Sequence, residues 1–141
     1  CVSICGDGGF TMTPHVLCTA VEYDIPAVWV VWNNFAWGAI RDIQYGLFEG
    51  RELGTAFYQG ENREPYNPDF AAMARSCGVQ ASTITQSHDF APALEHAIKQ
   101  NRPYLLDVHV DSEVRPPATG SWELPPIPPK EPVFGQPYTP E

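Results

Sequence analysis

The sequence has little positive charge. Its 141 residues contain 8 Lys and Arg against 17 Asp and Glu, a formal net charge of -9. Nucleic acids and anionic membranes are bound mainly through clustered basic side chains, and the chain has no basic run. We therefore expect neither as a partner. An anionic ligand would have to be held by a metal ion and by backbone N–H groups.

The sequence also lacks cysteine pairs, long apolar runs and a leader peptide. Cys1, Cys5, Cys18 and Cys77 form no C-x-x-C pair, which favours reduced, buried thiols over disulfides or a zinc cluster. No apolar run approaches the roughly 18 residues of a membrane span. No basic segment precedes a short apolar one, as a signal peptide would require. We expect a soluble, cytoplasmic protein.

The start of the chain lacks an initiator Met. Val2 to Cys5 already has the pattern of a buried strand, with no capping element before it. Such a strand would lie inside a parallel sheet and needs partners on both sides. We interpret the chain as a fragment of a longer protein.

The body of the chain alternates strand and helix patterns. With 43% hydrophobic residues, it is long enough for one core of ordinary domain size. Apolar and turn residues predict strands over residues 1–5, 27–32, 79–85 and 104–110, and helices over 13–24, 37–48, 67–78 and 89–100. Residues 50–66 are polar and read as a surface loop or lid. The predicted fold is a three-layer α/β/α sandwich with a mainly parallel sheet.

The composition changes at Arg115. Nine of the 15 prolines fall between Pro116 and Pro140, where hydrophobic periodicity is weak. We divide the chain into an α/β domain over residues 1–114 and an extended, Pro-rich tail over residues 115–141. The tail is either a solvated disordered end or a segment docked on the domain or on a neighbouring subunit. Apolar residues such as Trp122 and Phe134 favour docking.

Two polar motifs follow the first two predicted strands. Gly6-Asp7-Gly8-Gly9 comes after the first, and Asn33-Asn34 comes after the second. Strand, helix, strand in this length is a βαβ unit, so both motifs should meet at the carboxyl edge of the sheet. A carboxylate and an amide oxygen suit Mg²⁺ or Ca²⁺, and glycines let backbone N–H groups approach phosphate.

The two motifs together predict a site for a divalent metal and a diphosphate. A backbone carbonyl just past Asn34, that of Ala36, could supply a third oxygen. N–H groups around Gly8, Gly9 and Phe10 and the positive end of the helix starting at Thr13 would complete the cradle. The alternative for each motif alone is a glycine turn with capping side chains, but the joint spacing favours the metal site.

These residues carry a family resemblance that runs from Cys1 to about Asp111. The stretch from Gly6-Asp7-Gly8-Gly9-Phe10 to Val30-Val31-Trp32-Asn33-Asn34 resembles the thiamin diphosphate fingerprint of acetolactate synthase-like 2-oxo acid decarboxylases and carboligases. The resemblance implies that Asp7, Asn34 and the Ala36 carbonyl bind Mg²⁺. It also implies a wider set of cofactor-binding residues: Gly6, Asp7, Gly8, Gly9, Phe10, Asn34, Ala36, Trp37, Gly38 and Ile40.

The sequence departs from the family pattern at two places. Family members often carry Ser where Gly9 stands, and many have Gln or Glu before a Leu in the stretch that here reads Thr13-Pro14-His15-Val16. Both departures bear on the finer chemistry of the pocket. The metal ligands themselves match.

The resemblance also implies activity and partners. Relatives use the thiazolium ring as an electron sink to decarboxylate a small 2-oxo acid. The activating glutamate comes from a pyrimidine-binding domain, so this chain would be a C-terminal pyrophosphate-binding fragment, inactive alone. Pyrimidine-binding and middle domains, on the same or a companion chain, and a dimer or tetramer are implied. Whether FAD sits in another domain is not assignable.

Several alternatives stay open at this point. Sulfoacetaldehyde acetyltransferase, benzoylformate decarboxylase or a non-catalytic cofactor-binding piece could replace acetolactate synthase. Cys1 could be the nucleophile of an N-terminal nucleophile hydrolase, although no sandwich-like strand spacing follows it. Weaker candidates are His15 near the diphosphate, and Arg115 and Trp122 as closure elements.

Overall fold

The computed structural model describes residues 1–114. The predictions for the Pro-rich tail, including Arg115 and Trp122, lie outside the described residues. Among the residues described, no helix has both the length and the apolar character needed to cross a membrane.

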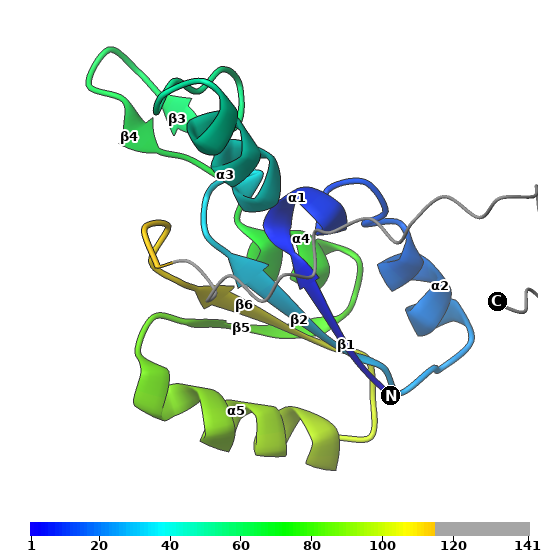
Figure 1. Cartoon of the computed structure of the whole chain (residues 1–141). Helices are drawn as coiled ribbons and strands as arrows, with labels where there is room; N and C mark the ends of the chain where they lie inside the picture. Colours follow the sequence, from blue (N-terminus) through cyan, green and yellow to red (C-terminus); the bar gives the residue numbers. More distant parts are fainter. Residues whose placement is uncertain (115–141) are drawn as a thin grey trace, which may run out of the picture.

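The centre of the molecule is a parallel four-stranded sheet. It contains β1 (Val2–Gly6), β2 (Val28–Asn33), β5 (Gln80–Ile84) and β6 (Tyr104–His109) in the order β1-β2-β6-β5 (Figure 1). The strands form where β-branched and aromatic residues run continuously. Within residues 1–114, β1 pairs only with β2 and Ile4 is 70% exposed, so its predicted second neighbour is not present in this part of the chain.

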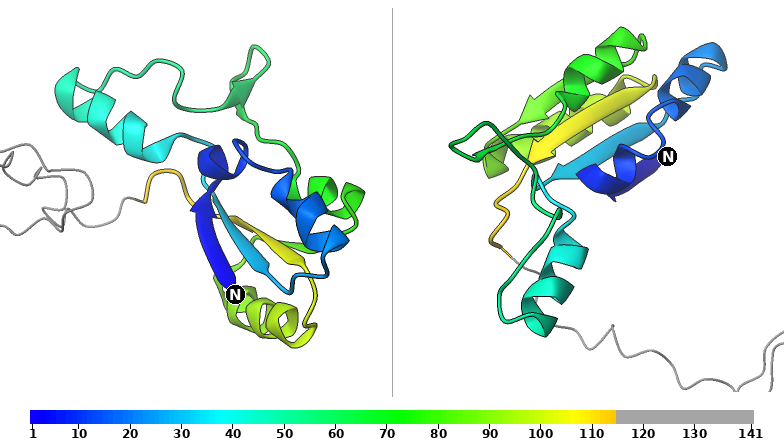
Figure 2. Two further views of the ribbon diagram at one scale, coloured as in Figure 1. Left: turned by 90° about the vertical axis from the view of Figure 1, so that its right-hand side faces the viewer. Right: turned by 90° about the horizontal axis from the view of Figure 1, so that it is seen from above.

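Helices cover both faces of the sheet. Figures 1 and 2 show α5 (Ser87–Lys99) on one face and α1 (Asp7–Phe10), α2 (Val16–Glu22) and α4 (Phe70–Ser76) on the other. Alternate strand side chains feed two cores: Val31 and Leu105 pack with Phe70 on the α4 side, and Val30 and Leu106 pack on the α5 side. The predicted three-layer α/β/α sandwich is confirmed.

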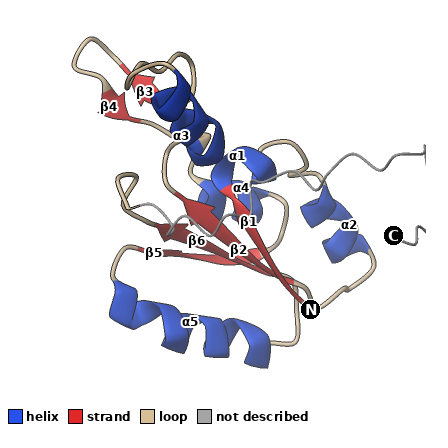
Figure 3. Ribbon diagram, in the orientation of Figure 1, coloured by secondary structure: helices blue, strands red, loops and turns tan. Residues whose placement is uncertain are grey.

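An arm projects from the carboxyl edge of the sheet. We define it as residues 38–66, which include α3 (Gly38–Leu47) and a two-stranded hairpin, β3 (Tyr58–Gln59) with β4 (Glu64–Pro65) (Figure 3). The prediction of a surface loop or lid over residues 50–66 missed this hairpin. Its strands are two residues long and exposed, so no buried face imposes an alternation of apolar and polar residues on the sequence.

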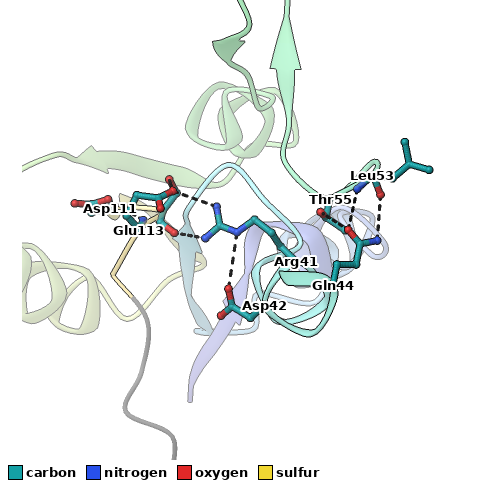
Figure 4. A network of polar contacts seen from close by, with 8 residues as sticks. Arg41, Asp42, Gln44, Leu53, Thr55, Asp111 and Glu113 are labelled. Atoms are coloured by element: carbon teal, nitrogen blue, oxygen red, sulfur yellow. Dashed lines mark hydrogen bonds and ion pairs between the residues drawn. The ribbon is translucent and has the colours of Figure 1, made fainter. Parts of the chain in front are cut away.

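Two side chains of α3 fasten the arm, as Figure 4 shows. Gln44 Oε1 accepts hydrogen bonds from the Leu53 N–H at 2.9 Å and from Thr55 Oγ1 at 3.2 Å. Arg41 is only 3% exposed and donates to the carbonyl of Ser112, while its Nη1 lies 3.6 Å from Glu113 Oε1. The arm is therefore tied both to itself and to the segment that follows β6.

Several predicted helix ends differ from the structure. The glycine turn after β1 is itself the helical turn α1, and the helix expected from Thr13 starts at Val16. The helix expected from residue 89 starts at Ser87.

The cap of α4 is Asp69 and not Asn67. Asp69 Oδ1 accepts the Ala72 N–H at 2.7 Å, the usual geometry of an N-cap side chain. The prediction that Asn67-Pro68 begins this helix was therefore wrong by two residues. The Asn67 side chain is left available for other contacts.

The cysteines also differ in part from expectation. All four are free thiols, but Cys1 and Cys18 are exposed, while Cys5 and Cys77 are half-buried. Burial raises the pKa of the Cys5 thiol. The expectation of buried thiols thus fails for two of the four.

Candidate functional site

The two motifs meet at one cleft beyond the carboxyl ends of β1 and β2. The strands are parallel with Gly6 opposite Trp32, so Asp7 and Asn34, which follow directly, emerge at the same edge. The cleft has a volume of about 630 Å³. Nine of the ten residues predicted to bind the cofactor line it: Gly6, Asp7, Gly8, Gly9, Asn34, Ala36, Trp37, Gly38 and Ile40.

Phe10 is the predicted residue that does not line the cleft. Its side chain is 2% exposed and packs edge-on against Phe70, with ring centroids 5.5 Å apart. Only its backbone could contribute to a site.

Asp7 is a buried carboxylate with three N–H donors. It is 1% exposed; its Oδ1 accepts the Gly8 N–H at 2.8 Å, and its Oδ2 accepts the Ala36 N–H at 3.3 Å and Asn67 Nδ2 at 2.5 Å. No Lys, Arg or His of residues 1–114 forms an ion pair with it. Because buried charges need a counter-charge, this carboxylate suits a bound cation.

Asn34 and Ala36 offer oxygens that the protein does not use. Within the described residues, neither the Asn34 side chain nor the Ala36 carbonyl takes part in a hydrogen bond, although both residues line the cleft. The Ala36 backbone is fixed by a bridge to Ala56 in the arm. A carboxylate, an amide oxygen and a carbonyl form the hard donor set that Mg²⁺ prefers, so these residues fit such an ion.

The glycines around these ligands allow close approach. A Cβ at Gly38 would lie 2.6 Å from Asn34 Nδ2, and one at Gly8 would lie 3.2 Å from the Trp37 ring. At Gly9 a Cβ would meet nothing within 4 Å. A side chain at Gly8 or Gly38 would therefore press on Trp37 or Asn34, whereas the position of Gly9 would also accept the serine of the family pattern.

A second group of polar residues lies behind Asp7 and was missed from the sequence. Asn67 Nδ2 donates to Asn33 Oδ1 at 2.7 Å, and Asn33 Nδ2 donates to Asp107 Oδ1 at 3.0 Å. His109 Nε2 lies 3.5 Å from Asp107 Oδ2. A possible signal was the presence of Asn33 and Asp107 inside otherwise apolar strands, since buried polar groups need partners.

Burial sets the electrostatics of this group. Desolvation raises the pKa of Asp107 above its usual value, although the bond from Asn33 and the nearby His109 act in the opposite direction. The His109 ring packs edge-on against Phe35, with centroids 5.1 Å apart.

Comparison with known sequences identifies relatives of the whole cleft-forming region. The chain is 34% identical over 119 residues to the putative thiamine pyrophosphate-containing protein YdaP of Bacillus subtilis, a match covering 84% of this chain and 19% of that protein. It is 38% identical over 110 residues to a probable acetolactate synthase large subunit of Methanocaldococcus jannaschii, covering 78% of this chain and 17% of the relative.

The fold has a counterpart of known structure. A thiamine diphosphate-dependent 4-hydroxybenzoylformate decarboxylase of Rhodococcus jostii RHA1 superposes with a TM-score of 0.68 at 26% identity, covering 78% of this chain and 19% of that protein. The chain thus spans less than a fifth of each of these three relatives. Residues 1–108 match the family described as thiamine pyrophosphate enzyme, C-terminal TPP binding domain, and the chain belongs to that family.

Proposed function

We propose that this chain binds Mg²⁺ and the diphosphate of thiamin diphosphate as part of a 2-oxo acid decarboxylase or carboligase such as acetolactate synthase. The observation that carries the proposal is one cleft that brings together the Asp7 carboxylate, the Asn34 amide and the Ala36 carbonyl. Family membership supports the choice of cofactor.

Each residue has a defined part in this proposal. Asp7, Asn34 and the Ala36 carbonyl hold the ion, which neutralises diphosphate charge that a protein of net charge -9 would otherwise repel. The Gly8 N–H already donates to Asp7. We therefore assign the diphosphate oxygens to the N–H groups of Gly9 and Phe10.

The bound cofactor would supply an electron sink for cleavage of the bond next to the carbonyl of a 2-oxo acid. Trp37 and Ile40, which are 41% and 47% exposed, would line the cleft on the side of the cofactor rings. The activating glutamate, further domains and a homo-oligomer belong to the same proposal, as does a cytoplasmic location. The small fraction of each relative that the chain spans supports the expectation that it does not act alone.

Calorimetric titration of the full-length protein with thiamin diphosphate and Mg²⁺ tests the metal site. Asp7→Asn keeps the size of the side chain but removes its charge. Removing one partner of a buried charge pair costs about 3–5 kcal/mol, so we expect the affinity to fall about 10²- to 4 × 10³-fold. Undiminished affinity, or binding independent of Mg²⁺, would overturn the proposal.

Asp24→Asn is the matched control. Asp24 is exposed and lies in the turn before β2, at the opposite edge of the sheet from the cleft. Its φ is 51°, a conformation that Asn also tolerates, so the substitution should preserve the turn. Affinity should equal that of the wild type.

Product analysis separates the candidate reactions. Acetolactate formed from pyruvate supports a carboligase, and an aldehyde formed from a 2-oxo acid without carbon–carbon bond formation supports a decarboxylase, the activity named for the Rhodococcus jostii structure. Conversion of sulfoacetaldehyde and phosphate to acetyl phosphate and sulfite would support the third candidate. Cofactor binding without turnover of any of these would favour a non-catalytic binding role.

A further inference from the structure

The Asn67 side chain joins the first residue of α1, Asp7, to the last residue of β2, Asn33. Its Nδ2 lies 2.5 Å from Asp7 Oδ2 and 2.7 Å from Asn33 Oδ1. An amide nitrogen has two hydrogens, so these two contacts use its full donor capacity. Asn67 is therefore committed to the site and not to the cap of α4, which Asp69 provides.

The orientation of the Asn67 amide follows from its neighbours. Asn33 Oδ1 also accepts the backbone N–H of Phe35 at 3.3 Å, and Asn33 Nδ2 donates to the Asp107 carboxylate at 3.0 Å. A backbone N–H can only donate, so the oxygen of the Asn33 amide must face it. Asn67 must then present its NH₂ group, because the Asp7 carboxylate and the Asn33 amide oxygen that it meets are both acceptors.

Asn67 contributes the shortest contact to the Asp7 carboxylate. Its 2.5 Å distance compares with 2.8 Å for the Gly8 N–H and 3.3 Å for the Ala36 N–H. The Gly8 donor is the next residue in the chain, whereas Asn67 lies 60 residues away. The rotation of the carboxylate is therefore fixed largely by a side chain from a distant segment.

Asn67 directly follows the arm, and the arm also holds the backbone of Ala36, whose carbonyl is one of the proposed metal ligands. The Phe35 carbonyl accepts the Phe57 N–H at 2.9 Å, and the Trp37 N–H donates to the Thr55 carbonyl at 2.7 Å. These two bonds flank Ala36. The arm thus fixes the Ala36 backbone through residues 55–57, and its return into α4 brings Asn67 to Asp7.

We propose that Asn67 is a positioning residue for the metal site: it holds the Asp7 carboxylate in the orientation that Mg²⁺ requires and couples this orientation to the arm. The proposal rests on the function proposed above. Mg²⁺ demands near-ideal octahedral geometry, whereas Ca²⁺ accepts irregular sets of oxygens, so loss of orientation should affect Mg²⁺ more than Ca²⁺.

The test is calorimetric titration of MgCl₂ and, separately, CaCl₂ into the full-length protein with thiamin diphosphate present. Asn67→Ala removes the donors, and Asn67→Leu removes them while keeping the volume in case the alanine variant does not fold. Loss of a residue that orients a metal ligand typically costs about 10- to 100-fold in metal affinity. We expect this loss for Mg²⁺ and a loss of less than about threefold for Ca²⁺.

One control separates positioning from general loosening. Asn62→Ala makes the same change at an exposed position of the arm. It should keep the wild-type ratio of Mg²⁺ to Ca²⁺ affinity. Mn²⁺ in place of Mg²⁺ gives an electron paramagnetic resonance spectrum that reports the ligand geometry directly, and it should change only in the Asn67 variants.

The outcomes distinguish this inference from the proposed function. If the wild-type protein binds thiamin diphosphate without any dependence on Mg²⁺, both fail. If the wild type binds Mg²⁺ but the Asn67 variants keep its affinity and the Mn²⁺ spectrum, or lose Mg²⁺ and Ca²⁺ affinity equally, Asn67 does not position the metal site. A selective loss of Mg²⁺ affinity together with an altered spectrum supports it.

Discussion

Substitution of Gly38 by Ala should displace a metal ligand without harming the fold. A Cβ at this position would lie 2.6 Å from Asn34 Nδ2 and 3.7 Å from its Cγ. The three nearest atoms it meets outside its own helix all belong to the Asn34 side chain. Within residues 1–114, that side chain makes no hydrogen bond that would hold it in place, so it can move.

The size of the effect follows from the overlap. Ordinary contacts of a Cβ begin near 3.4 Å, so the Asn34 amide must shift by about 0.8 Å or change its rotamer. Distances from metal to ligand tolerate only about 0.2 Å, and a shift of this size removes the amide oxygen from the ion. We expect Mg²⁺-dependent affinity for thiamin diphosphate to fall about 10- to 100-fold.

Gly46→Ala is the matched control for this prediction. Gly46 lies in the same helix, α3, and a Cβ there would meet nothing within 4 Å. Since Ala is favoured over Gly inside a helix by about 1 kcal/mol, this variant should be slightly more stable and bind the cofactor normally.

The assay combines calorimetry on the full-length protein with thermal unfolding in the absence of cofactor. The Gly38→Ala protein should melt near the wild-type temperature and bind weakly. Wild-type affinity in Gly38→Ala would refute the placement of Asn34 at the metal. An equal loss of affinity in both variants would show that changes to α3 itself, and not the overlap with Asn34, weaken binding.

Two further predictions concern the residues that support the site. The pKa of Asp107 is raised in the folded state above its usual 3.8, so folding takes up a proton and the free energy of unfolding should fall as pH rises through that interval. Asp107→Asn should remove this slope in urea titrations at successive pH values, and an unchanged slope would contradict the assignment. Arg41→Met should lower the free energy of unfolding by about 1.5–3 kcal/mol, because the Ser112 carbonyl loses a charged donor. Unfolding by urea at neutral pH would show this, and a loss below about 0.5 kcal/mol would contradict it.

The sheet could be predicted from the sequence because its strands are continuous and apolar. Val28, Val30 and Val31 are at most 3% exposed. Because the strand is buried on both faces, its sequence is a continuous apolar run, a pattern that polar loops do not show. The hairpin of the arm could not be predicted in this way. Tyr58 and Pro65 form one of its two pairs, in strands exposed to solvent, so its backbone bonds place no constraint on hydrophobicity.

The meeting of Asp7 and Asn34 at one cleft could be predicted because topology brings them together. In a βαβ unit the first residues after both strands lie at one edge, so Asp7 and Asn34 are placed by the fold alone. No such rule places Asn67. Asn67 lies 60 residues from Asp7 in the chain, and the arm lies between them, so their contact depends on the tertiary arrangement of the arm and α4.

The error over Asn67 has a physical cause that applies to other chains. Asn67 and Asp69 stand two residues apart before an apolar helical pattern, and both are good N-cap residues. A helix needs one such cap, and the structure gives it to Asp69. The other polar side chain is then half-buried without a local partner, a costly state unless a distant group satisfies it. A surplus capping residue next to a buried segment therefore predicts a long-range hydrogen bond, and here that bond reaches the carboxylate of the cleft.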